Sequence, residues 1–284
     1  MWLEAIPRSR VVFVMLRLGL CSGAYITRDA MGVIGAAVAA RLEAIEWAAD
    51  AHIGIGDRQA AERIMIATLS SGLTTASYST LYRVGSEEGT TAHFDALLEI
   101  ASILHAPIMR LYAWGNSVDA IEEANGRYGS KGFASRVAQF RRLGDRAAAK
   151  GITLCMSMGR GKCHDRYDRA VHLVESIDHD FVRVAWEDLP GAEPTEATAA
   201  LNRAGRSTAL LIVRCAARDG KPRDLVKEDW RARIQAYKHC EGNPKMTRFV
   251  LLGASRPEGV AGGLILAADA SALRGMIAEV EDVS

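Results

Sequence analysis

One pattern repeats along the chain: a short apolar or β-branched run, a polar turn, and then a segment with helical periodicity. Strands that alternate with helices in this way predict a parallel sheet, and strands that are apolar throughout predict a sheet buried on both faces. Eight such units in 284 residues fit a closed (β/α)8 TIM barrel better than a doubly wound sheet. The predicted strands are Leu16–Ser22, Leu42–Trp47, Thr74–Tyr78, Ile108–Ala113, Thr153–Met158, Phe181–Trp186, Leu210–Ala216 and Phe249–Gly253.

The segments between these runs carry helix signals. Asp57–Ser71 begins with a good N-cap residue, and Ser130–Lys150 and Leu225–His239 have a similar periodicity. Gly72 and Gly151 stand where a helix passes into a strand, a position that favours the left-handed backbone. No linker, low-complexity tract or charge block marks a second domain. We therefore expect a single-domain barrel over residues 15–284, preceded by an extension over residues 1–14, with Met15 as an alternative start.

Composition excludes several classes of function. The formal net charge is +1, which disfavours extensive nucleic-acid binding. The five cysteines are scattered and show no CxxC or zinc-like spacing, so they are expected to be reduced, buried thiols of a cytoplasmic protein. Arg17 interrupts the first apolar run, which is too short to span a membrane. We expect a cytoplasmic protein with no nucleic-acid partner and no membrane partner.

Active sites of such barrels lie at the mouth, meaning the carboxyl ends of the strands and the loops after them. Glu46, Asp50 and His52 follow one another at the end of the second strand. Histidine titrates near neutrality and a nearby carboxylate can orient it, so the group is a candidate acid/base site. Glu187, at the end of the sixth strand, is a further acid/base candidate. The alternative for His52 is a surface side chain in a capped loop.

Cationic and aromatic residues follow the third to eighth strands. The candidate ligand-binding residues are Tyr78, Arg83, Arg110, Trp114, Arg160, Lys162, Trp186, Arg214, Arg218 and Arg256. The planar fork of arginine binds carboxylate or phosphate through two hydrogen bonds. Because the overall charge is balanced, a ring of arginines at one end of the barrel would be a local feature, and it predicts an anion-binding mouth. Alternatively, some of these arginines pair with nearby acidic residues, and the tyrosines pack on helices.

Five stretches resemble the xylose-isomerase-like superfamily of sugar phosphate isomerases and epimerases. They are LRLGLCS (16–22), RLEAIEWAADAHI (41–53), SGLTTASYSTLYRVG (71–85), LGDRAAAKGITL (143–154) and VESIDHDFVRVAW (174–186). The resemblance runs from about Met15 to the C-terminus, and the second and third stretches are its most specific parts. It implies a TIM barrel in which Glu, Asp or Gln, His and Glu from four late strands hold a divalent metal. That metal polarises a hydroxy-carbonyl unit while acid/base groups move a proton or hydride.

The chain departs from this pattern of ligands. The Glu of the fifth strand falls at Ser157, the His of the seventh near Arg214, and the Glu of the eighth near Leu252. The ligand of the sixth strand falls near Trp186 or Glu187. Serine, arginine and leucine are not ligands for a hard divalent cation. We therefore expect no metal site and no cofactor.

These features favour an enzyme that acts on a small anionic sugar or hydroxy-carbonyl compound by metal-independent proton transfer. Arg160 and Arg214 would replace the cation, and His52 with Asp50 or Glu46 would transfer the proton. The alternative is a non-catalytic ligand-binding barrel, either a pseudoenzyme or the regulatory partner of an active paralogue. The missing ligands and neutral charge disfavour a metal-dependent endonuclease for abasic sites. A homodimer is a candidate assembly, since such barrels often pair.

Overall fold

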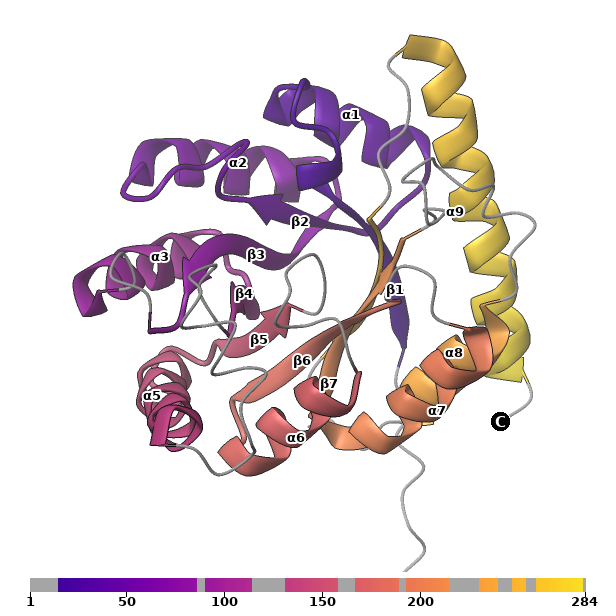
Figure 1. Ribbon diagram of the computed structural model, residues 1–284. Helices are drawn as coiled ribbons and strands as arrows, with labels where there is room; N and C mark the ends of the chain where they lie inside the picture. Colours follow the sequence, from indigo (N-terminus) through magenta and orange to yellow (C-terminus); the bar gives the residue numbers. More distant parts are fainter. Residues whose placement is uncertain are drawn as a thin grey trace, which may run out of the picture.

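The computed structural model describes residues 15–85, 90–113, 131–157, 167–188, 193–214, 230–239, 247–253 and 259–282. Within these ranges, eight parallel strands close into a barrel in chain order, with β1 paired to β8 (Figure 1). The strands are β1 (Leu16–Cys21), β2 (Ala44–Ala48), β3 (Thr74–Arg83), β4 (Ile108–Tyr112), β5 (Thr153–Ser157), β6 (Val182–Glu187), β7 (Thr208–Val213) and β8 (Arg248–Leu252). The predicted (β/α)8 barrel is thereby confirmed. Residues 1–14 lie outside the described ranges, so the expected extension stays a prediction.

Helices surround the barrel on its outer side (Figure 1). They are α1 (Ala30–Ala39), α2 (Arg58–Ser70), α3 (Thr91–Ile103), α5 (Lys131–Ala148), α6 (Tyr167–Ile177), α7 (Pro194–Ala204), α8 (Arg231–His239) and α9 (Gly259–Asp282). Two single 3-10 turns, η1 (Ser22–Ala24) and η2 (Gly205–Ser207), lie at strand ends. No helix in the described ranges has the length and apolar character needed to cross a membrane.

The helix cap and the left-handed glycines predicted from the sequence are present in the structure. The Asp57 carboxylate caps α2 by accepting a hydrogen bond of 2.9 Å from the Ala60 amide, which satisfies one of the free donors of the first turn. Gly72 and Gly151 follow α2 and α5 with φ angles of 75° and 69°. A side chain at either position would be strained, so glycine lets each helix turn directly into the next strand.

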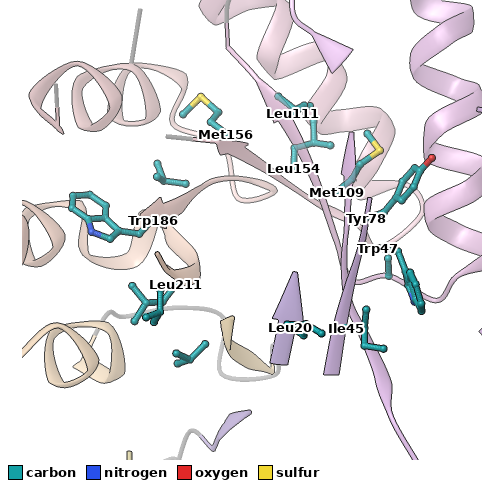
Figure 2. Packing of buried hydrophobic residues seen from close by; sticks show 14 of the residues in the cluster. Leu20, Ile45, Trp47, Tyr78, Met109, Leu111, Leu154, Met156, Trp186 and Leu211 are labelled. Carbon is teal, nitrogen blue, oxygen red and sulfur yellow. The ribbon is translucent and has the colours of Figure 1, made fainter. Parts of the chain in front are cut away.

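The hydrophobic core has two layers, as expected for a barrel with an outer ring of helices. The larger layer lies between the strands and the helices and contains the buried aromatic residues Trp47, Tyr78 and Trp186 (Figure 2). The smaller layer fills the barrel interior. Its members are Cys21, Ala44, Ala76, Ile108, Cys155, Ala185, Ala209, Leu210, Ile212, Phe249 and Leu251. Along most strands the side chains of this layer alternate with side chains of the outer layer, and this alternation decides which residues reach the mouth. In β7 the adjacent residues Ala209 and Leu210 both belong to the interior layer, where the register with β6 shifts.

Candidate functional site

Four charged side chains from four strands come together at the carboxyl end of the barrel. Glu46 lies in β2 and Arg110 in β4, while Glu187 ends β6 and Arg214 directly follows β7. Arg110 feels the charges of both glutamates, and Arg214 feels those of Glu187 and Arg110. We call these four residues the ionic cluster. It contains two carboxylates and two guanidinium groups, and the sequence had assigned all four residues to the site.

The first pair of the ionic cluster is buried. Arg110 Nη1 lies 3.2 Å from Glu46 Oε1, and the two side chains are 5% and 3% exposed. The hydroxyl of Ser77 donates a 2.5 Å hydrogen bond to the other carboxylate oxygen, Oε2. Burial disfavours the charge on Arg110, but the neighbouring Glu46 and other anionic groups outweigh it and raise the pKa of Arg110. Glu46 is therefore held from two sides, and Arg110 stays protonated.

The second pair is more open. Arg214 Nε donates to Glu187 Oε2, and the Arg214 side chain is 34% exposed while that of Glu187 is 7% exposed. The charge of Glu187 is the main reason that the pKa of Arg214 is raised. This pair therefore presents a permanently charged guanidinium to solvent with a nearly buried carboxylate beneath it.

Cys21 completes the interior of the cluster. It ends β1, pairs in register with Glu46, and is buried. Burial, followed by the charge of Glu46, raises the pKa of the Cys21 thiol well above its usual range. The thiol is therefore neutral and serves as packing. The sequence predicted a buried free thiol here, which the structure confirms. It did not predict that this thiol lies beside the carboxylate of Glu46.

His52 is fixed by hydrogen bonds on both ring nitrogens. Nε2 lies 3.1 Å from the carbonyl oxygen of Arg28, and Nδ1 lies 3.1 Å from the hydroxyl of Ser22. A carbonyl only accepts, so Nε2 carries the proton and Nδ1 accepts from Ser22. The same hydroxyl oxygen accepts a 2.9 Å hydrogen bond from the amide of Ala48. His52 thus connects the ends of β1 and β2, and sequence reasoning missed the role of Ser22.

Burial is the main cause that lowers the pKa of His52, while Asp50 acts on the ring in the opposite direction through its charge. The lowered pKa keeps the imidazole neutral at physiological pH. Its two hydrogen bonds favour a positioning role. The proton-transfer role expected from the sequence for His52 and Asp50 stays a prediction.

Two aromatic residues expected at the mouth lie elsewhere. Tyr78 and Trp186 are fully buried in the outer core layer (Figure 2). The Tyr78 hydroxyl donates a 2.8 Å hydrogen bond to the carbonyl of Ile53, and Trp186 stacks on Tyr167 with ring centroids 4.8 Å apart. Their strand positions point them toward the helices, so the structure corrects their placement.

The remaining predicted residues divide into two groups. Arg83, at the end of β3, lies over the ring of Tyr112 at 5.4 Å from its centroid, a cation–π contact at the rim of the mouth. The other predicted ligand-binding residues lie outside the described ranges. They are Trp114, Arg160, Lys162, Arg218 and Arg256.

The residues at the expected metal positions do not fit a divalent cation. Ser157 ends β5, Arg214 follows β7 and Leu252 ends β8, which leaves Glu187 as the one carboxylate among them. That carboxylate is bound to Arg214. In the described ranges, no group of three or more His, Cys, Asp or Glu side chains is arranged to hold a metal ion. A step that needs a divalent cation therefore has no set of ligands among the described residues.

Three buried donor atoms near the cluster make no hydrogen bond to an acceptor among the described residues. One of them, Arg110 Nη1, keeps its ion pair with Glu46, and the other two have no such neighbour. These two are Ser157 Oγ and Arg110 Nε. Arg110 pairs in register with Cys155, two residues before Ser157, so both side chains point to the same face of neighbouring strands. Buried donors are normally satisfied, so this place favours an acceptor oxygen from a water molecule or a ligand.

Comparisons with known proteins show the fold more clearly than the sequence does. The chain matches no protein-family model and no curated protein. A D-psicose 3-epimerase from Clostridium cellulolyticum H10, solved with D-tagatose, superposes with a TM-score of 0.67 at 15% identity, covering 94% of this chain and 99% of that one. A putative xylose isomerase from Rhodospirillum rubrum gives 0.68 at 13% identity over 92% and 99% of the two chains.

A third structure, the IolI protein with a bound zinc atom, gives a TM-score of 0.67 at 11% identity and covers 93% of this chain and 99% of that one. The chain thus has the fold of the xylose isomerase-like TIM barrel epimerases and isomerases. At these identities the likeness concerns the fold alone.

Proposed function

We propose that the protein is an enzyme of the isomerase or epimerase type that acts on a small anionic sugar or hydroxy-carbonyl compound without a metal. The observation that carries the proposal is the Glu187–Arg214 pair, in which a partly exposed guanidinium covers a nearly buried carboxylate at the mouth. Arginine binds carboxylate, phosphate and developing oxyanions through the same fork of donors. The likeness in fold to sugar epimerases and isomerases supports the reaction type.

The reaction would begin when an oxygen of the substrate replaces Glu187 as the partner of Arg214. The released carboxylate of Glu187 then takes the proton from the carbon next to the substrate carbonyl. The electron pair of that C–H bond moves to the carbonyl oxygen, and Arg214 stabilises the resulting oxyanion. Return of the proton to the former carbonyl carbon, together with transfer of the hydroxyl proton from the neighbouring oxygen to the oxyanion, completes an isomerisation. Protonation of the original carbon on its opposite face by a second acid, with the carbonyl re-formed and Glu187 keeping the proton that it took, completes an epimerisation.

The rest of the cluster would support this step electrostatically. Arg110 remains protonated beneath the mouth because the negative charge of Glu46 stabilises its positive charge. Its Nε and the hydroxyl of Ser157 are free to donate to an oxygen of the ligand. Preorganised donors in a buried site stabilise developing charge more than the same donors do in water. In this proposal, fixed cations replace a Lewis acid, and His52 holds the ends of β1 and β2 in place.

The test is solvent hydrogen exchange. Purified protein is incubated in D2O with a panel of ketohexoses, pentuloses and their phosphates, and deuterium incorporation next to the carbonyl is followed by NMR with and without a chelator. We expect exchange that the chelator does not affect and that Glu187→Gln reduces by about 100-fold or more. Glu62→Gln, the same change on the exposed surface of α2, is the matched control. A stoichiometric divalent ion in the active protein, or full exchange in Glu187→Gln, would contradict the proposal.

One observation favours the non-catalytic alternative. Both carboxylates of the ionic cluster are already bound to arginine, so neither is free to act as a base in the ligand-free protein. A regulatory or pseudoenzyme barrel would bind an anion at Arg214 without exchanging its protons. Ligand-induced thermal stabilisation that Arg214→Gln abolishes, with no deuterium exchange in the wild-type protein, would identify this function.

A further inference from the structure

We propose a second ligand site, for a small organic oxyanion such as a phosphorylated compound, at the amino-terminal end of the barrel. A pocket of about 350 Å3 lies there, at the opposite end from the ionic cluster. Its lining comes from the starts of β1, β3, β5 and β8 and from the turns that precede β4, β5 and β6. We call it the basal pocket. Its volume lies within the range of small-molecule sites, about 300–1,000 Å3.

The basal pocket is electropositive. Arg17 is the second residue of β1 and pairs in register with Phe249, whose side chain belongs to the interior layer of the barrel. Arg17 therefore points inward, is half-buried, and has no ion-pair or hydrogen-bond partner in the part of the chain that the structure describes. The other titratable lining residue is His105, and no carboxylate lines the pocket among the described residues. A concave surface with an unneutralised guanidinium attracts anions.

Threonine hydroxyls supply the polar contacts that an oxyanion needs. Thr74, Thr75, Thr153 and Thr247 line the pocket from the starts of three strands. The Thr74 hydroxyl makes a long 3.3 Å hydrogen bond to the carbonyl of Glu43. Thr247, at the start of β8, is exposed and its hydroxyl is able to donate to a ligand. A guanidinium in a pocket that also contains threonine side chains matches a phosphate group, which offers acceptor oxygens in several directions.

The pocket is larger than a bare phosphate ion requires. Phe181, Phe249 and Pro107 form its apolar part. This combination fits a phosphate group attached to a short carbon skeleton. The basal pocket is separate from the mouth, because the packed interior layer, which includes Ala44, Leu210 and Leu251, fills the barrel between them. A ligand bound there would contact the starts of several strands at once and would stabilise the folded barrel by linkage.

The test follows the pocket threonines directly. In protein labelled at threonine methyl groups, inorganic phosphate and then glycerol 3-phosphate are titrated, and the shifts of Thr74, Thr75, Thr153 and Thr247 are followed by NMR. We expect these methyls to move together with one dissociation constant, and the organic phosphate to bind more tightly than phosphate. Arg17→Gln should weaken binding about tenfold or more, because it removes the charged donor. Arg63→Gln removes the same charge from the exposed surface of α2 and should leave the affinity unchanged.

Two further variants keep the test decisive. Arg17→Lys retains the charge but not the fork, so it gives an intermediate affinity and shows the site even if Arg17→Gln fails to fold. Arg214→Gln, at the mouth, should leave the pocket methyl shifts unchanged. The proposal is overturned if the four methyls do not respond to either phosphate, or if they respond equally in wild-type protein and in both Arg17 variants.

Discussion

Replacing Glu46 with glutamine is expected to destabilise the barrel far more than the same replacement at the surface. In the folded protein the Glu46 carboxylate forms an ion pair of 3.2 Å with Arg110 and accepts a hydrogen bond of 2.5 Å from the Ser77 hydroxyl. The Glu46 side chain is 3% exposed. Glutamine keeps the size of the side chain but removes its charge. Arg110, which is 5% exposed, would then be a buried guanidinium without its counter-charge.

The expected magnitude follows from that burial. Removing one partner of a buried ion pair costs about 3–5 kcal/mol in the free energy of unfolding, because the remaining charge stays desolvated. The surface pair Arg58–Glu99 provides the matched control, since its side chains are 59% and 45% exposed. Glu99→Gln should cost about 0–1 kcal/mol, as water screens the pair and solvates the remaining charge. The costs of the two identical substitutions should therefore differ by about 2–5 kcal/mol.

The assay is urea unfolding monitored by circular dichroism, with the double-mutant cycle of Glu46→Gln and Arg110→Met. The double variant should lose less stability than the sum of the single variants, since it removes both charges together. If Glu46→Gln costs less than about 1 kcal/mol, or if the cycle shows no coupling, the buried pair does not hold the mouth and the reasoning fails.

Three further predictions concern individual side chains. Burial lowers the pKa of His52, so its contribution to stability is present above its ordinary value of 6.5 and is lost as pH falls through the lowered pKa. The urea midpoint of His52→Asn should therefore fall less between pH 7.5 and 5.5 than that of the wild-type protein. An equal fall in both proteins would contradict the lowered pKa of His52. Cys21 and Cys155 have raised pKa values, about 12 for Cys155, and both are buried. Their peptides should stay unlabelled by iodoacetamide at pH 8 until the protein is unfolded, as read by mass spectrometry. Gly19→Ala would place a methyl group 2.7 Å from the carbonyl oxygen of Ala44, so it should cost about 1–3 kcal/mol by urea unfolding, whereas Gly35→Ala meets no neighbouring atom and should not destabilise the fold.

The sequence predicted the fold well because each barrel unit carries its own local signals. All eight predicted strands exist, but their ends shift. β3 was expected to end at Tyr78 and continues to Arg83, because the Thr80 hydroxyl donates to the carbonyl of Arg110 and the Val84 amide donates to Tyr112, which keeps β3 beside β4. Such contacts between strands are tertiary, so the composition of one segment does not reveal them.

The candidate site was predicted less well, for a reason of geometry. In a sheet buried on both faces, apolar residues occupy both sides of every strand, so the pattern does not show which residues point inward. The register also shifts, between Ile45 and Glu46 in β2 and between Val184 and Ala185 in β6. Strand-end residues of the right chemistry were therefore found, but Trp186 was placed at the mouth although it faces the helices. No sequence pattern indicated that Ser22 would bind His52 or that Ser77 would bind Glu46.

The pairing of β1 with β8 has a consequence for how the chain is made. β1 is synthesised first and β8 last, so one edge of β1 has no partner until almost the whole barrel has left the ribosome. Unpaired strand edges invite association with other chains, and contacts between distant segments form slowly. The nascent protein therefore passes through a long interval as an open, incomplete sheet. Its yield in the cell should depend on protection during synthesis more than its final stability would suggest.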